Sequence, residues 1–206
     1  MIENNPKEKE ILEAARSRFA HYGYSKVTME EIASDVEMGK ASLYYYFPTK
    51  EELFKSVIKK EQNLFVREIE NLVEKNFSAS QKLKEYVSKR LEYFQQLVNL
   101  GTLNLHSVVG ISSMFKELLK AFEAQEIILI QKIFEEGKIK GEFDKNLDEK
   151  TTCIFLHLLQ GLRLQTIKSI KSSRLENDHY DALKEEMMIF VDIFLKGIKA
   201  HQDEIN

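Results

Sequence analysis

Apolar residues recur at helical spacing along almost the whole chain. In residues 6–22, Ile11, Ala15 and Phe19 lie four positions apart and share one helix face, and Gly23 follows as a stop signal. The same reasoning predicts further helices over residues 29–36, 40–46, 49–76, 79–99, 102–109, 112–138, 149–172 and 179–201. An all-α protein is therefore expected.

Helix boundaries are most sharply marked near the N-terminus. Thr28 and Thr49 each precede a glutamate by three positions, the pattern of a capping box. Pro48 disfavours helical geometry at the preceding residue, so the helix over 40–46 has to stop there. Three helices within about 45 residues, the last two joined by a short turn at 37–39, indicate a helix-turn-helix unit.

A long helix from residue 49 follows this unit, and at 1.5 Å per residue it is about 40 Å long. That length is sufficient to leave one domain and enter another. The prediction is a helix-turn-helix domain at 1–50 and a larger helical bundle at 51–206, fused by the long helix.

The helix over 40–46 has two contrasting faces. Leu43 and Phe47 are one turn apart and point towards the apolar residues of the preceding helix, so Ala41 and Tyr45 lie nearly opposite that core face. A small residue beside a large aromatic one on an outward helix face suits a helix that enters the major groove of DNA.

Hydroxyl groups and lysines surround this outward face. Ser42 and Tyr44 lie on its two flanks, with Lys40 at the helix start, Lys50 at the next helix start, and no acidic residue between them. Such groups bind phosphates and hold a helix on a duplex. The alternative is that the tyrosines cap a small apolar core and that the lysines are ordinary surface charges.

Residues 11–54 resemble the N-terminal domain of the TetR family of bacterial transcriptional repressors. The family pattern of a first amphipathic helix, Thr-x-x-x-Ile-Ala, a turn and Lys-Gly-Thr-Leu-Tyr-x-x-Phe-x-x-Lys-x-x-Leu is matched here by Thr28, Ile32, Ala33, Lys40, Leu43, Tyr44, Phe47, Lys50 and Leu53. The match covers the first quarter of the chain, and beyond it only the helical layout and the length agree.

The resemblance implies roles for eight residues of the DNA-binding domain. It implies phosphate contacts for Thr28, Ser42, Tyr44 and Lys50, base-edge contacts for Lys40, Ala41 and Tyr45, and a contact of Tyr46 with the DNA backbone or a base methyl group. The two-faced pattern of the helix points to the same roles for Ala41, Ser42, Tyr44 and Tyr45.

The turn departs from the family pattern. Glu37 stands where the family usually has glycine, so the turn either avoids positive φ or is strained. Gly39 replaces the usual serine cap, Ala41 replaces a glycine, and Ser42 replaces a threonine. These changes keep the helix-turn-helix but obscure the operator sequence.

Composition excludes several other classes of protein. Net charge is −3, so any contact with nucleic acid depends on a local patch, and the single cysteine excludes an internal disulfide. No secretion signal, membrane span, metal-ligand spacing, nucleotide-binding loop or nucleophile motif is recognisable, and Glu135, Glu136 and Glu142 look like solvated surface. We expect a cytoplasmic protein that is not an enzyme and has no metal or cofactor.

Two helices in the second half, around 153–164 and 187–195, are apolar nearly all round. Each is either a central core helix or packs against a second subunit on one face. In the TetR family the last two helices form the dimer interface, so the resemblance implies a homodimer. The residues expected there are Phe155, Leu159, Gly161, Leu162, Phe190 and Phe194.

The middle of the bundle corresponds to the effector pocket of the family, whose occupancy moves the long helix and with it the recognition helices. Ordinary core packing is the alternative for each residue that could line such a pocket. The candidates are Tyr86, Tyr93, Phe94, His106, Met114, Phe115, Phe122 and Phe134, and their character suggests a mainly apolar small molecule.

The leading hypothesis is a homodimeric repressor that a small molecule releases from a near-palindromic double-stranded DNA operator. One alternative is a helical small-molecule carrier or enzyme with a vestigial helix-turn-helix. Another is an architectural DNA-binding protein without a ligand.

Overall fold

The computed structural model describes residues 5–99, 113–169 and 177–200. Its helices are α1 (Pro6–Tyr22), α2 (Met29–Asp35), α3 (Lys40–Tyr46), α4 (Lys50–Val73), α5 (Ala79–Asn99), α6 (Ser113–Ile139), α7 (Glu149–Ser169) and α8 (Asn177–Gly197). This confirms the predicted all-α fold. The helix expected over 102–109 lies outside the described residues. None of the described helices carries the apolar run that a bilayer span requires.

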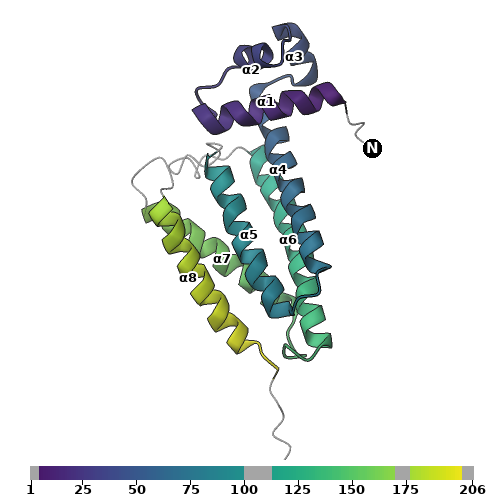
Figure 1. Cartoon of the computed structure of the whole chain (residues 1–206), viewed down its shortest axis with the longest axis vertical. Coiled ribbons are helices and arrows are strands. Elements are labelled where there is room, and N and C mark those ends of the chain that lie inside the picture. The colour runs from purple at the N-terminus through teal and green to yellow at the C-terminus, as the bar shows by residue number, and fades with distance from the viewer. Residues whose placement is uncertain (1–4, 100–112, 170–176, 201–206) are drawn as a thin grey trace, which may run out of the picture.

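Two groups of helices are joined through α4 (Figure 1). The first three helices lie at one end of the molecule, and α4 runs from them along the bundle formed with α5 to α8. The N-terminal core contains buried Ile11 and Phe19 of α1 and Ile32 of α2. The ring of Phe54 in α4 meets that of Phe19 edge-on at 4.9 Å. The core of the first domain therefore continues past the boundary predicted at residue 50.

Further along, α4 enters a second core. Phe65 stacks on Tyr93 of α5 with ring centroids 5.0 Å apart, and its edge meets Phe122 of α6 at 5.6 Å. Between the two cores, the Arg16 side chain of α1 donates a 2.8 Å hydrogen bond to the buried carboxylate of Glu61. A single helix thus belongs to both packing units.

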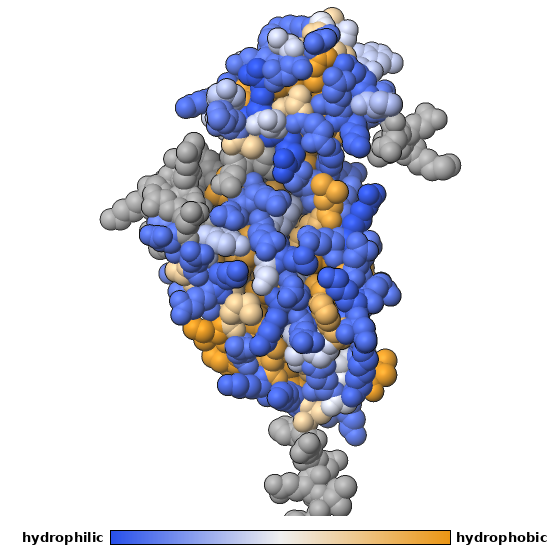
Figure 2. Space-filling model, in the orientation of Figure 1, coloured by the Kyte–Doolittle hydropathy of each residue, from blue (hydrophilic) through white to orange (hydrophobic). Residues whose placement is uncertain are grey.

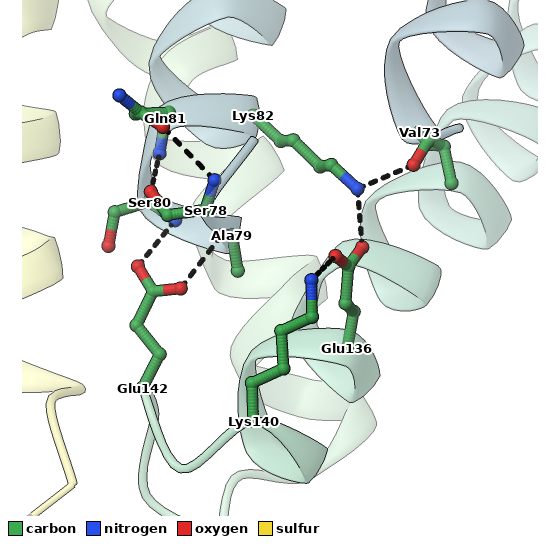
Figure 3. A network of polar contacts seen from close by, with 9 residues as sticks. All are labelled: Val73, Ser78, Ala79, Ser80, Gln81, Lys82, Glu136, Lys140 and Glu142. Carbon is green, nitrogen blue, oxygen red and sulfur yellow. Dashed lines mark hydrogen bonds and ion pairs between the residues drawn. The ribbon is translucent and has the colours of Figure 1, made fainter. Parts of the chain in front are cut away.

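At the far end of α4, polar contacts fix the start of α5 (Figure 3). The Glu142 carboxylate accepts hydrogen bonds of 2.8 Å from the backbone N–H groups of Ala79 and Ser80. The buried Lys82 ammonium donates to the Val73 carbonyl and to Glu136, both at 2.6 Å. Glu142 and Glu136 are therefore structural, which corrects the expectation that both are merely solvated. A carboxylate at the start of a helix stabilises the backbone N–H groups that have no hydrogen-bond partner within the helix.

Gly137 allows Glu142 to reach that position. The chain folds back after α6, and the N–H groups of Glu142 and Phe143 both donate to the Gly137 carbonyl, at 2.8 and 3.1 Å. A Cβ atom at Gly137 would lie 2.2 Å from the ring of Phe143, which is buried. A glycine is needed here because the ring occupies the place of a side chain.

We expect Gly137→Ala to lower the free energy of unfolding by about 2 kcal/mol, because the added methyl group displaces the Phe143 ring. Chemical denaturation followed by circular dichroism measures this change. Gly197→Ala is the matched control, since a Cβ atom there has no neighbour within 4 Å. Equal stability of the two variants would contradict the packing argument.

Candidate nucleic-acid interface and effector pocket

The short helix α3 is anchored from behind and exposed in front. Leu43 is fully buried and Phe47 nearly so, while Tyr45 on the opposite side is 85% exposed. Ala41 and Ser42 are also exposed. The structure therefore places these side chains as the helical spacing predicted. The α3 outer face, meaning Lys40, Ala41, Ser42, Tyr44 and Tyr45, is free to meet a partner.

Tyr46 differs from its two neighbours. It is partly buried and packs against the N-terminal core, while its ring meets the edge of the Tyr45 ring at 5.9 Å. This side chain supports the exposed tyrosine from the side. A contact of Tyr46 with DNA, which the resemblance implied, stays a prediction.

The turn before α3 is strained. Glu37 has φ 51°, the left-handed region that a side chain disfavours by roughly 1–2 kcal/mol. The turn is closed by a 2.8 Å hydrogen bond from the Met38 N–H to the Ala33 carbonyl. Of the two outcomes that the sequence left open, the strained turn is the one observed.

Lys40 lies on the exposed surface beside an acidic side chain. Its ammonium forms an ion pair with Glu30 of α2 and lies 5.9 Å from the centre of the Tyr44 ring. The hydrogen bond with Glu30 raises the pKa of Lys40 and, in return, lowers that of Glu30. Exposed ion pairs are weak, so Glu30 does not prevent other contacts of Lys40, and its contact with base edges stays a prediction.

Lys50 has an internal role that the sequence did not reveal. Its ammonium donates hydrogen bonds of 2.9 Å to the carbonyls of Tyr24 and Val27 and lies 4.5 Å from the centre of the Tyr24 ring. It therefore ties the start of α4 to the loop between α1 and α2. A phosphate contact of this ammonium would have to compete with those bonds.

Thr28 also has internal partners. Its hydroxyl accepts from the Glu31 N–H at 3.3 Å, and the Glu31 carboxylate accepts from the Thr28 N–H at 2.8 Å. These bonds complete the predicted capping box at the start of α2. Thr28 is exposed beside the turn, so its phosphate contact stays a prediction.

The candidate effector residues divide into separate groups. Tyr86, Tyr93, Phe94 and Phe122 are buried in the bundle, and the rings of Tyr86, Tyr93 and Phe122 pack against Phe65 of α4. Phe134 packs elsewhere, with its ring 5.8 to 6.2 Å from the rings of Phe143, Phe155 and Phe194. The structure therefore does not bring Phe134 into the first group. His106 and the side chains of Met114 and Phe115 lie outside the described residues.

Charged residues also lie among these buried aromatic residues, and the sequence analysis did not identify them. Arg90 donates a 2.5 Å hydrogen bond to Glu126, to which the Tyr86 hydroxyl also donates at 2.6 Å. Arg163 of α7 lies with its guanidinium 5.6 Å from the centre of the Phe94 ring. The one available signal was Arg163 itself, a charged residue inside an otherwise apolar run.

The six expected dimer residues differ in their burial within the protomer. Phe155 and Leu159 are buried inside the protomer, and Phe155 packs against Phe190 and Phe194 of α8, with centroids 6.0 and 4.9 Å apart. Phe190, Phe194 and Leu162 are only partly buried, and Gly161 is exposed. The buried pair therefore packs in the bundle core, and a role of the six residues in a dimer stays a prediction.

Other residues of α7 and α8 expose apolar side chains. We define the α7–α8 face as Ile154 and Leu158 of α7 with Ile189 and Ile193 of α8. Each exposes about half or more of its area, up to 64% at Ile193. Figure 2 shows apolar surface along the α8 side of the bundle. Such a face indicates a contact with another protein surface.

Residues 11–57 match the family model described as "Bacterial regulatory proteins, tetR family". A solved structure of a transcriptional regulator from Cytophaga hutchinsonii is 38% identical, with a TM-score of 0.89, over 95% of this chain and 100% of that one. The chain belongs to the TetR family. It is a transcriptional regulator with a DNA-binding domain, and not an enzyme.

Curated TetR-like relatives extend the similarity beyond the first domain. The HTH-type transcriptional regulator QacR of Staphylococcus aureus is 26% identical over 94% of this chain and 98% of its own length. The fatty acid metabolism regulator protein of Bacillus subtilis is 25% identical over 72% of this chain and 76% of its own. The similarity therefore includes parts of the bundle.

We expect Glu37→Gly to raise the free energy of unfolding by about 1 kcal/mol, because glycine adopts the left-handed conformation without steric cost. Glu37→Ala removes the same charge but keeps a Cβ atom, so it should bring little change. Urea denaturation of both variants measures the difference. If alanine stabilised the protein as much as glycine, the charge and not the backbone would be responsible.

Proposed function

We propose that the protein is a homodimeric repressor that binds a near-palindromic operator in the cytoplasm and is released by a small, mainly apolar molecule. The observation that carries the proposal is the α3 outer face, in which Tyr45 is 85% exposed while Leu43 is completely buried. A helix presented in this way can insert its outer side chains into a major groove.

The chemistry of the α3 outer face suits DNA. Tyr45 and Ala41 lie at its centre and offer a hydroxyl group and a methyl group to base edges. Ser42 and Tyr44 flank them with hydroxyl groups for phosphates, and Lys40 adds a positive charge at the helix start. The short length of α3 limits direct readout to a few base pairs, so affinity requires a second copy.

The α7–α8 face supports the homodimer. Its four isoleucine and leucine side chains come from two neighbouring helices, and the same patch on a second subunit is complementary by twofold symmetry. Exposed Gly161 on α7 allows two backbones to approach closely. A dimer of this kind presents two copies of α3 to two half-sites of one operator.

The aromatic group in the bundle supports the effector proposal. Phe65 of α4 lies among Tyr86, Tyr93 and Phe122, so a molecule bound among these rings contacts the helix that also carries Phe54 of the first domain. One curated relative is named a fatty acid metabolism regulator, which fits an effector with an apolar body.

Replacement of Tyr45 tests the DNA-binding surface. We expect Tyr45→Ala to weaken binding to the promoter DNA next to its own gene by about tenfold or more, because a groove contact is lost. Electrophoretic mobility shift at low salt measures the affinity. Tyr22→Ala is the control, since Tyr22 is also exposed but is the last residue of α1, and α1 lies between the bundle and the helices α2 and α3 (Figure 1). Equal losses in both variants would exclude α3 as the reading helix.

Replacement of Ile193 tests the dimer. We expect Ile193→Glu to give monomers at concentrations where the wild type is a dimer, because two carboxylates would meet in an apolar contact. Sedimentation equilibrium measures the mass, and DNA affinity should fall with it. The control is Ile139→Glu, at a residue of α6 that is 84% exposed. A dimeric Ile193→Glu variant would show that the subunits associate elsewhere.

A further inference from the structure

The buried polar group at the centre of the bundle contains an excess positive charge. Two arginines, Arg90 and Arg163, lie there with one carboxylate, that of Glu126. Glu126 is only 1% exposed and Arg163 only 8%. One carboxylate balances one guanidinium, so one positive charge remains without a counter-ion among these groups. An uncompensated buried charge is costly for a folded protein and is retained mainly where it has a function.

The partners within the group identify which arginine is left over. Arg90 and the Tyr86 hydroxyl both donate to the same oxygen of Glu126, Oε1. The other oxygen of Glu126, Oε2, and the Tyr93 hydroxyl are buried without a hydrogen-bond partner. Within the described part of the chain, the Arg163 guanidinium lies over the Phe94 ring without a hydrogen bond or ion pair, and the Glu126 carboxylate acts on it only through its charge. The Arg163 guanidinium, the Glu126 Oε2 atom and the Tyr93 hydroxyl are therefore available to bind a ligand.

The electrostatic surroundings agree with this assignment. Burial, followed by the positive charge of Arg90, lowers the pKa of Arg163 to about 9. The guanidinium therefore remains protonated at neutral pH. Burial also lowers the pKa of Arg90, but the Glu126 carboxylate and the Tyr86 oxygen more than offset it, so the pKa of Arg90 is raised. The two arginines thus differ: Arg90 is hydrogen-bonded to the Glu126 carboxylate, whereas Glu126 acts on Arg163 through its charge alone, and one carboxylate cannot balance both.

Aromatic rings lie close to both guanidinium groups. Arg163 lies 5.6 Å from the centre of the Phe94 ring, and Arg90 lies 5.2 to 5.7 Å from the ring centres of Phe65, Tyr93 and Phe122. Aromatic faces attract a cation but do not cancel its charge.

From this arrangement we infer that the effector is an organic anion: a carboxylate or similar oxyanion that binds Arg163, attached to an apolar or aromatic body that lies against Phe94 and the neighbouring rings. The Tyr93 hydroxyl can donate a hydrogen bond to the anion, and the free Glu126 oxygen can accept one from a donor group elsewhere on the molecule. This inference depends on the proposed regulator function and narrows its mainly apolar effector to an amphipathic acid. A neutral molecule of the same shape leaves Arg163 uncompensated and binds more weakly.

The first test needs no ligand. We expect Arg163→Met to raise the melting temperature of the ligand-free protein, because it removes a buried charge without a counter-ion and fills the space with an apolar chain. Arg67→Met, on the exposed surface of α4, is the matched control and should leave the melting temperature unchanged. A lower melting temperature or loss of folding in Arg163→Met would show that the charge is compensated within the protein, and the inference would be wrong.

The second test compares matched pairs of probes by isothermal titration calorimetry: dodecanoate with dodecan-1-ol, and 2-naphthoate with 2-naphthalenemethanol. We expect the acid of at least one pair to bind the wild type and Arg67→Met at least tenfold more tightly than its alcohol. Arg163→Met should lose that preference. Equal binding of acid and alcohol, a preference that survives in Arg163→Met, or no binding by either acid would overturn the inference.

DNA binding separates this inference from the proposed function. In mobility-shift assays without ligand, Arg163→Met should bind promoter DNA as the wild type does, while the acid that binds should release only the wild type. If neither protein binds DNA, the repressor proposal fails even if the preference for an acid is found. If both bind DNA and both are released equally by the alcohol, only the anionic effector is excluded.

Discussion

The burial of Leu43 and Phe47 is the constraint on which the DNA-binding surface depends. A helix of seven residues is not stable alone, and α3 also lacks a side-chain cap at Gly39. It persists because these two side chains enter a core shared with α1, α2 and the start of α4. They also fix the rotation of the helix, so the outward position of Tyr45 is a consequence of packing. The strained turn at Glu37 is tolerated for the same reason.

A second constraint is the continuity of α4, which places Phe54 in the first core and Phe65 in the second. A straight helix does not move at one end only. On our proposal, an effector that displaces Phe65 therefore also shifts Phe54 and the helix-turn-helix that rests on it. The hydrogen bond between Arg16 and Glu61, midway along, ties α1 to the same motion. The two copies of α3 in a dimer would then no longer match two half-sites.

The helices could be predicted because they depend on neighbouring residues, whereas contacts between residues far apart in the sequence could not. The end of α3 follows from Pro48, and its bounds agree with the prediction because backbone restrictions act between neighbours. The carbonyls that accept hydrogen bonds from Lys50 belong to a loop more than 20 residues earlier in the chain, so the sequence did not reveal them and suggested a DNA phosphate as the partner of Lys50. A helix that is apolar all round does not reveal which side faces outward, so the sequence alone could not show that Phe155 is buried in the protomer while Ile154 is exposed. Arg163 was overlooked because charged residues are ordinarily assigned to the surface.

The central claim, that the α3 outer face meets DNA, is tested most directly by fluorine NMR of protein labelled with 3-fluorotyrosine. Tyr45→Phe assigns the resonance of Tyr45, one of eight tyrosines. Because this ring is largely exposed, our account predicts that its resonance shifts or broadens when promoter DNA is added, and that the resonance of Tyr22 stays in place. An unchanged Tyr45 resonance in a sample whose protein is bound to DNA would contradict the account.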